Sequence, residues 1–169
     1  EAFLSSVRLR LRADVEVGTC LSGGLDSTAI ACATGRFLDE HGVPECRHAF
    51  TALLPEFDES AYIRPVVDQV GAKWHVTVAS DDHLLDEAVR FFRVHDEPVH
   101  SLSPLAGFMV MGLAARSQVR VLLNGQGSDE LLAGYPSTVL PHLRSLIRED
   151  GLGAALEQGR AQAGRSEER

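Results

Sequence analysis

Apolar residues along this chain follow two alternating spacings, which predict strands separated by helices. Short apolar or alternating runs of strand length occupy residues 15–20, 46–54, 74–78 and 119–123. Segments with helical spacing occupy residues 2–12, 26–40, 63–70, 82–93, 105–117, 137–148 and 152–163. This regular alternation predicts an α/β fold, in which a doubly wound, mostly parallel sheet has helices on both faces.

One helical segment contains a proline whose effect the pattern leaves open. Ile63, Val66 and Val70 recur at helical spacing, and Pro65 lies among them. An interior proline removes a backbone hydrogen bond and clashes with the preceding turn. We therefore expect this helix either to begin near Arg64 or to be kinked.

The loop after the first strand has the composition of an anion-binding site. Residues 21–28 read Leu-Ser-Gly-Gly-Leu-Asp-Ser-Thr and lead directly into a helix. Glycines let the backbone approach a ligand closely, and the N–H groups and dipole of a helix N-terminus favour negative charge. The hydroxyl groups of Ser22, Ser27 and Thr28 add further donors. We expect this loop to bind a phosphate chain.

Asp26 indicates which phosphate chemistry the loop supports. A carboxylate repels a phosphate unless a cation lies between them, so Asp26 favours Mg²⁺ as a bridge. The alternative is that Asp26 caps its own helix, a position where aspartate is common. A lysine-containing phosphate loop of the form G-x-x-x-x-G-K-[ST] does not occur, and Lys73 is the only lysine.

A second loop follows the strand at residues 119–123. Residues 124–135 read Asn-Gly-Gln-Gly-Ser-Asp-Glu-Leu-Leu-Ala-Gly-Tyr. This is not a dinucleotide-binding fingerprint, because Glu130 occupies the position of its third glycine. Asp26 and Asp129 each follow a predicted strand, and parallel strands present their carboxyl ends at one edge of the sheet. The two carboxylates are therefore expected to meet.

The two loops resemble those of a known enzyme family. S-G-G-x-D-S looks like the pyrophosphate loop of the ATP pyrophosphatases, which cleave ATP between its α- and β-phosphates. Residues 124–135 are similar to the G-E-G-S-D-E-x-x-x-G-Y segment of the glutamine-hydrolysing asparagine synthetases. Shorter pieces agree with that family at residues 8–15, 57–60 and 96–98, and the likeness covers roughly residues 5–140.

This resemblance implies an ATP-dependent ligase. Such an enzyme adenylates a carboxylic acid, releases pyrophosphate and transfers the acyl group to an amine; in asparagine synthetase these substrates are aspartate and ammonia. The implied cofactors are ATP and Mg²⁺, the metal being held by Asp26 and Asp129. The residues expected to bind ATP or pyrophosphate are Leu21, Ser22, Gly23, Gly24, Asp26, Ser27, Thr28, Ala52, Asn124 and Gly125. Catalytic roles are expected for Asp26, Asp129 and Gln126.

Gln126 departs from the family pattern, which has glutamate at this position. A carboxylate accepts a proton from an incoming amine, whereas an amide does not, so the nucleophile stays open. Two alternatives follow. One is an adenylating cyclase of antibiotic or peptide biosynthesis, such as the β-lactam synthetases and lasso-peptide cyclases. The other is a nucleotide-binding module without turnover.

The resemblance also predicts how the chain is organised. We expect residues 1–135 to form the nucleotide-binding core and residues 136–169 to form a helical extension that begins the rest of a synthetase domain. The family's lysine near the adenylate has no match here, and the chain begins Glu1-Ala2-Phe3 in place of a cysteine nucleophile. We therefore expect a fragment that is inactive alone. Its parent protein is expected to include a glutaminase domain and the remaining synthetase residues, and a homodimer is possible.

Composition excludes several other classes of protein. The net charge of −8 and the lack of a basic run argue against a nucleic-acid partner. The longest apolar stretch, residues 105–115, is too short to span a membrane. Cys20, Cys32 and Cys46 are dispersed like reduced core thiols, which favours the cytoplasm. The histidines have no metal-ligand spacing, and His48 and His75 are expected to be ordinary strand residues.

Overall fold

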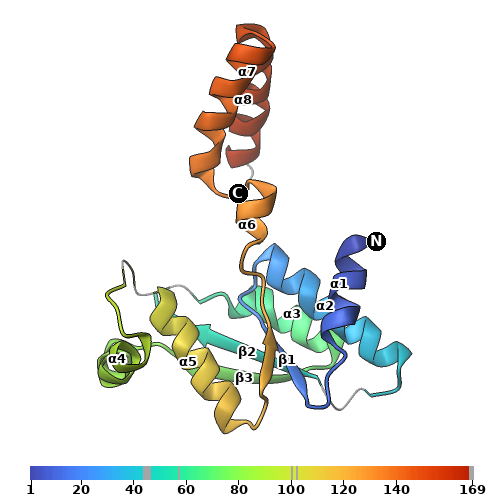
Figure 1. Ribbon diagram of the computed structural model, residues 1–169, viewed down its shortest axis with the longest axis vertical. Coiled ribbons are helices and arrows are strands. Elements are labelled where there is room, and N and C mark those ends of the chain that lie inside the picture. The colour runs from blue at the N-terminus through green and yellow to red at the C-terminus, as the bar shows by residue number, and fades with distance from the viewer. Residues whose placement is uncertain (44–46, 57, 100, 102, 168–169) are drawn as a thin grey trace. The chain divides into compact units, whose positions relative to one another are not determined.

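The computed structural model describes residues 1–43, 47–56, 58–99, 101 and 103–167 (Figure 1). The chain divides into two compact units, Glu1–Gly125 and Gln126–Arg169. The first unit contains the sheet and the second is helical. Each unit has its own packing.

The first unit contains a parallel sheet of four strands. These are β1 (Val17–Cys20), β2 (His48–Leu53), β3 (Lys73–Val78) and β4 (Val121–Leu123). They lie in the order β3-β2-β1-β4, with Cys20 opposite Phe50 and Thr19 opposite Leu123. Because β4 lies beside β1, the winding reverses between these two strands. Their carboxyl ends form the switch point at which open α/β sheets bind ligands. The predicted doubly wound parallel sheet is confirmed.

Helices cover both faces of the sheet (Figure 1). They are α1 (Ala2–Arg10), α2 (Leu25–Glu40), α3 (Ser60–Val70), α4 (Asp81–His95) and α5 (Ser103–Arg116). On one face α2 and α3 pack side by side, with α1 against α2. On the other face α5 packs on β2 and β3, with α4 against α5. Within the described ranges, no helix combines the length and apolar character needed to cross a membrane.

Each face of the sheet has its own apolar core. Ala49 and Phe50 are neighbours in β2 and therefore point to opposite faces. Ala49 packs under α2 and α3 with Leu21 and Ile63, and all three are almost fully buried. Phe50 packs under α5 with Val110. This two-sided burial explains why the strands contain near-continuous apolar runs.

The helix that contains Pro65 begins earlier than predicted. It starts at Ser60, so the expectation of a start near Arg64 is wrong. Pro65 is the sixth residue of the helix and lies on its exposed side. The missing N–H leaves the carbonyl of Ala61, which is also exposed, without a helical donor, and water satisfies such a group at little cost. Apolar burial of the opposite side of α3 therefore outweighs the proline.

β4 is shorter than the predicted strand at residues 119–123. Its ladder begins at Val121 because the residues from Ser117 to Val119 complete the end of α5. Gln118 has a left-handed φ of 63°, and the N–H of Val119 donates to the carbonyl of Ala114 at 3.0 Å. Val119 is nevertheless buried, as its apolar character predicts.

The second unit consists of short helices followed by a helical hairpin. Its elements are α6 (Ser128–Leu132), η2 (Pro136–Thr138), α7 (Val139–Glu149) and α8 (Leu152–Glu167). The hairpin of α7 and α8 matches the two helices predicted there, although α8 ends at Glu167 and not at residue 163. The helix α6 was not predicted, because five residues are too few for a periodic pattern to be visible.

Candidate active site

The loop of residues 21–28 lies at the carboxyl end of β1 and leads into α2. The buried Leu21 extends the ladder, because its N–H donates to the carbonyl of Phe50 at 2.9 Å. The helix begins at Leu25, with Gly24 as the N-cap and no side-chain capping hydrogen bond. The N–H groups of a first helical turn have no partner within the helix. They are thus open to a ligand, and their binding of phosphate stays a prediction.

Asp26 lies in the first turn of α2 and is half-buried. It is the second residue of the helix, and the N-cap position belongs to Gly24. The alternative that Asp26 is the residue capping its own helix is therefore wrong. A carboxylate here is favoured by the helix dipole and lies close to the N–H groups that would hold a phosphate.

Ser27 stabilises the shape of the loop from inside. Its side chain is buried, and its hydroxyl donates to the carbonyl of Gly24 at 3.1 Å and accepts from the N–H of Ser22 at 3.2 Å. The Ser22 hydroxyl is 3.1 Å from the Ser27 hydroxyl and is 3.4 Å from the N–H of Gly24. Ser22 itself is exposed. Direct binding of phosphate by these serines stays a prediction.

The start of the second motif lies against the first loop. A Cβ atom on Gly125 would be 3.0 Å from the Cβ of Asp26 and 3.5 Å from the backbone nitrogen of Ser27. The backbone of Gly125 thus lies against the first turn of α2, and only glycine allows this approach without displacement. Gly125 follows β4, and Asp26 follows β1. Gly125 and the first turn of α2 thus meet at the switch point of the sheet.

The rest of the second motif belongs to the helical unit. Gly127 has a left-handed φ of 93° and is the N-cap of α6. Asp129 lies in the first turn of α6 against Gly134, where an added Cβ would be 2.8 Å from the Asp129 Cγ atom. The Tyr135 hydroxyl donates to Glu130 at 2.9 Å, which raises the pKa of Tyr135 above its usual range. Gln126 is exposed. That Asp26 and Asp129 share one metal ion stays a prediction.

The carboxyl end of β2 lies next to this loop. Ala52 is half-buried, and the carbonyl of Leu53 accepts from the N–H of Ala79 at 2.8 Å, which extends the ladder with β3. The placement fits the predicted contact of Ala52 with ATP, which stays a prediction. Thr51 and Trp74 form hydrogen bonds beneath the loop that the sequence does not predict. Neither residue belongs to a motif, and no local pattern indicates their contact.

His48 and His75 form a hydrogen-bonded pair on the α5 face of the sheet. The Nδ1 atom of His48 is 2.9 Å from the Nε2 atom of His75, and the Ser117 hydroxyl is 3.2 Å from the Nδ1 atom of His75. Burial, followed by the charges of His48 and Lys73, lowers the pKa of His75. Among the described side chains, no group of three or more His, Cys, Asp or Glu could hold a metal ion.

Cys20 immediately precedes the loop and packs as an apolar residue. Burial raises the pKa of its thiol to about 11, so the thiol stays protonated near neutral pH and is not a nucleophile. Cys32 packs at the edge of the core under α2 and α3. Cys46 lies outside the described residues.

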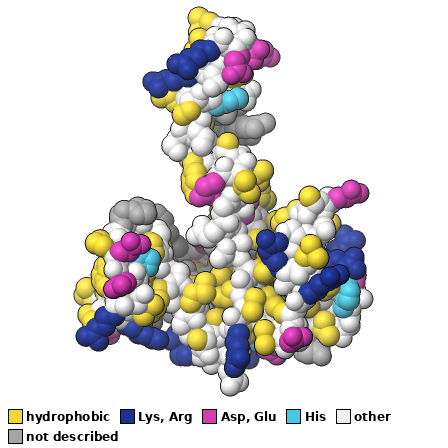
Figure 2. Space-filling model, in the orientation of Figure 1, with side chains coloured by type: hydrophobic (Ala, Val, Ile, Leu, Met, Phe, Trp, Pro, Cys, Tyr) yellow, Lys and Arg dark blue, Asp and Glu magenta, His cyan; other side chains and the backbone are white. Residues whose placement is uncertain are grey.

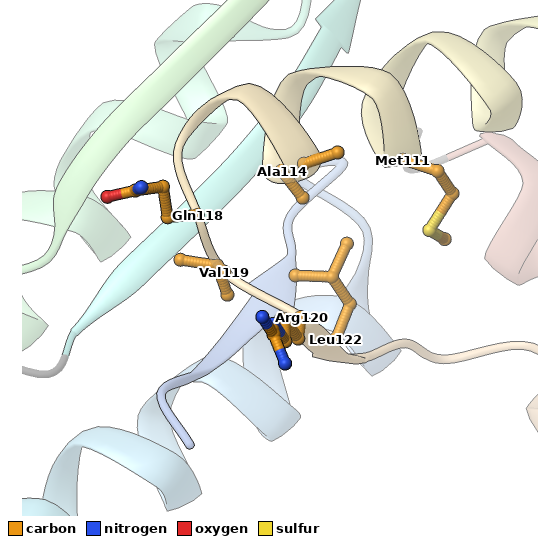
Figure 3. A pocket seen from close by; sticks show the side chains of 7 residues that line it. Met111, Ala114, Gln118, Val119, Arg120 and Leu122 are labelled. Carbon is orange, nitrogen blue, oxygen red and sulfur yellow. The ribbon is translucent and has the colours of Figure 1, made fainter.

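A pocket of about 570 Å³ lies elsewhere on the first unit (Figure 3). It is lined by Met111 and Ala114 of α5 and by Val119, Arg120 and Leu122. Since Val119 and Arg120 precede β4, this pocket is at the amino end of the strand, whereas Gly125 meets Asp26 at the carboxyl end. Figure 2 shows basic and acidic side chains interspersed on the visible face of each unit.

Comparison with known proteins identifies the family. The model of the family described as asparagine synthase matches residues 1–167. This chain belongs to the asparagine synthase family. A Methanocaldococcus jannaschii protein with the name of a glutamine-hydrolysing asparagine synthetase is 30% identical over 145 residues, which cover 85% of this chain and 27% of that protein. Asparagine synthetase 2 of Lotus japonicus is 28% identical over 143 residues, covering 80% of this chain and 24% of that protein.

Other proteins similar to this chain have different names. Amidase chyE of Penicillium rubens is 32% identical over 149 residues, which cover 78% of this chain and 21% of that protein. The chain thus spans between about a fifth and about a quarter of these relatives. Membership places it in a family of ligases that use ATP.

Proposed function

We propose that this chain is the ATP-binding part of a ligase that adenylates a carboxylic acid and transfers the acyl group to an amine, with asparagine-synthetase-like amidation as the reaction. The observation that most supports this is the approach of Gly125 to Asp26 and Ser27. This contact brings three features together at the switch point of the parallel sheet: the N-terminus of α2 without a side-chain cap, the carboxylate of Asp26 and the glycine turn that begins at Gly125.

The residues present fit a bound Mg²⁺ ion. Asp26 does not cap its helix, so its carboxylate is not used by the helix N-terminus. Gly125 has no Cβ, so its backbone lies directly beside the Asp26 side chain. Asp129 lies against Gly134, so its carboxylate has a defined place within the second unit. Carboxylate oxygens are the ligands that Mg²⁺ prefers. Asp26 and Asp129 would hold the ion, which when bound neutralises charge on phosphate oxygens.

In the proposed reaction the loop positions the phosphates for an in-line displacement. A carboxylate oxygen of the acid attacks the α-phosphorus, the bond from phosphorus to the oxygen bridging to the β-phosphate breaks, and pyrophosphate leaves. The first-turn N–H groups of α2 receive the charge of the departing pyrophosphate, with Ser22 and Thr28 as further donors. Ala52 would flank the adenine. An amine nitrogen then attacks the acyl carbon, and AMP leaves with the electrons of the carbon–oxygen bond.

The amine must lose a proton during acyl transfer. Gln126 occupies the position where glutamate would accept it, and an amide has no comparable basicity. Glu130 follows four residues later, and one oxygen of its carboxylate already accepts a hydrogen bond from the Tyr135 hydroxyl. We propose that residues outside this chain, or the substrate itself, receive the proton.

The proposal extends to the organisation of the parent protein. Residues 1–135 would form the nucleotide-binding core and residues 136–169 the start of the remaining synthetase domain. A glutaminase domain would supply ammonia, and aspartate is the first candidate acid. The enzyme would be cytoplasmic, with a homodimer as the candidate assembly. The short span of this chain relative to its relatives supports a larger parent.

Exchange of radiolabel between pyrophosphate and ATP tests this function. We expect the full-length parent to catalyse exchange that depends on both Mg²⁺ and a carboxylic acid. The 169-residue chain should bind Mg-ATP weakly without forming an acyl adenylate, because it has no match to the family's lysine near the adenylate. Loss of a preorganised cation from a phosphoryl site slows such chemistry by roughly 10³-fold or more. If the parent binds Mg-ATP but catalyses no ATP–pyrophosphate exchange with any of the acids tested, it is a nucleotide-binding module without turnover.

A second candidate is an adenylating cyclase or a related amide-forming enzyme with an amine other than ammonia. Gln126 favours it, because this residue departs from the asparagine synthetase pattern at the acid–base position. A relative named as an amidase is similar over most of the chain. Exchange that responds to an amino-containing acid, with no amide formed from ammonia, would favour this candidate.

A further inference from the structure

A chain of hydrogen bonds crosses the sheet directly beneath the phosphate loop. The indole Nε1–H of Trp74 in β3 donates to the hydroxyl oxygen of Thr51 in β2 at 2.9 Å. The hydroxyl of Thr51 in turn donates to the carbonyl oxygen of Leu21 at 2.7 Å. Leu21 is the residue before the Ser-Gly-Gly turn. The chain thus connects the edge strand to the start of the proposed phosphate loop.

The direction of these bonds follows from the groups involved. An indole N–H donates and never accepts, so Thr51 must accept from Trp74. The single hydroxyl proton of Thr51 is then free to point at Leu21, whose carbonyl only accepts. Thr51 is 2% exposed and Leu21 is 1% exposed, so water is not available to replace either bond. The Arg64 guanidinium lies 5.4 Å from the Trp74 ring centroid and restricts the ring further.

Leu21 is held at both of its backbone polar groups. Its N–H donates to the carbonyl of Phe50, and its carbonyl accepts from the Thr51 hydroxyl. This fixes the peptide plane that leads into Ser22 and hence the position of the turn. The regular ladder supplies only the first of these bonds, so the second depends on the side chain at residue 51. Loss of that hydroxyl would leave a buried carbonyl without a partner.

We propose that Thr51 and Trp74 are positioning residues for the phosphate loop, and that Trp74 reports occupancy of this loop through its emission. The inference rests on the proposed binding of Mg-ATP and adds the residues that preorganise the site. Trp74 is the only tryptophan of the chain, so all tryptophan emission comes from the side chain that forms this hydrogen bond. A shift of Leu21 on ligand binding would reach the indole through Thr51.

Substitutions of Thr51 test the proposal in the full 169-residue chain. Thr51→Val keeps the shape of the side chain and removes the hydroxyl, whereas Thr51→Ser keeps the hydroxyl. We expect Thr51→Val to weaken Mg-ATP binding about 10-fold by calorimetry and to abolish the change in Trp74 emission on titration. Thr51→Ser should restore both. Circular dichroism and thermal unfolding show whether each variant is folded.

Thr34→Val is a matched control. Its buried hydroxyl in α2 has no hydrogen-bond partner among the described residues, so the same chemical change removes no bond there. This variant should bind Mg-ATP like the unsubstituted chain. The positioning role would be overturned if Thr51→Val bound Mg-ATP as tightly as the unsubstituted chain. It would also be overturned if Thr51→Ser did not restore the affinity and the change in Trp74 emission. If the unsubstituted chain shows no binding of Mg-ATP at millimolar concentrations, the proposed function itself fails.

Discussion

At the scale of single residues, the site depends on side chains that leave room for a ligand. Gly125 brings its backbone against Asp26, and the cap of α2 is a glycine without a capping side chain. Ser27 uses its hydroxyl within the loop, so the loop keeps its shape without help from a ligand. A site built in this way is preorganised, and its residues gain little from packing against one another. Substitution of its carboxylate should therefore affect binding more than folding.

Replacement of Asp26 by alanine tests this directly. We expect Asp26→Ala to abolish magnesium-dependent ATP binding in calorimetry while thermal unfolding stays close to that of the unsubstituted chain. The half-buried Asp26 packs little and caps no helix, so its loss leaves no gap in the core. Asp68→Ala, on the exposed side of α3, is the control and should bind Mg-ATP normally. Unchanged affinity in Asp26→Ala would refute the metal role.

The lowered pKa of His75 makes stability depend on pH. Burial, together with the charges of His48 and Lys73, disfavours the protonated ring in the folded state. The unfolded chain, in which His75 has its usual pKa of 6.5, then binds the proton more readily. The resulting stability is complete above pH 6.5 and is lost as the pH falls towards the lowered pKa.

Urea unfolding at pH 7.5 and pH 5.5 measures this effect. We expect the free energy of unfolding to fall at the lower pH, and His75→Gln to reduce that fall. His142→Gln, at an exposed position in α7, should leave the pH dependence unchanged. An unaltered pH dependence in His75→Gln would place the responsible groups elsewhere.

At the scale of elements, the position of β1 depends on close packing from both neighbouring strands. Gly18 lies in the middle of β1, between β2 and β4. A Cβ atom there would be 2.7 Å from a ring carbon of Phe50 and 2.9 Å from a methyl carbon of Leu122. The glycine thus allows large side chains from both neighbours to cover β1. Because β1 leads into the phosphate loop, its packing also sets the place of the site.

Gly18→Ala should accordingly destabilise the protein. We expect a loss of about 1–3 kcal/mol in urea unfolding, since overpacking forces buried neighbours to move. Gly107→Ala is the matched control, because a Cβ at this position of α5 meets nothing within 4 Å. That change should be neutral or stabilise by up to about 1 kcal/mol, because alanine is the better helix former. Equal effects of the two substitutions would contradict the packing argument.

At the scale of the whole molecule, the proposed shared ion takes one carboxylate from each unit. Asp26 belongs to Glu1–Gly125, and Asp129 belongs to Gln126–Arg169. A shared ion would require both carboxylates at once, so the effects of the two residues on ligand binding would be coupled. Removal of either carboxylate alone would then already disrupt the site.

A double-mutant cycle measures this coupling. We expect Asp26→Ala and Asp129→Asn each to weaken Mg-pyrophosphate binding, and the double variant to lose clearly less than the sum of the two effects. Glu130→Gln replaces Asp129→Asn in the control cycle, because Glu130 bonds to Tyr135 and has no expected metal role. Additive effects in the first cycle would mean that the two aspartates do not share an ion.

The sequence by itself determined the class of fold and the residues of the two motifs. Apolar spacing reports burial locally, so the strands and most helices could be found from it. The turn that precedes α2 and the glycines of the second motif are also local, since their chemistry lies within a few consecutive residues. The parallel sheet, with both loops following its strands, was predicted from the strand–helix alternation.

Only the tertiary structure decided which distant residues touch. The position of β4 beside β1, the contact of Gly125 with Asp26 and the bonds from Trp74 through Thr51 to Leu21 all join segments far apart in the chain. Pro65 likewise fits inside α3 because the opposite side of that helix is buried against the sheet. Such contacts arise when helices and strands pack together, and that packing depends on the whole core and not on any short stretch of sequence.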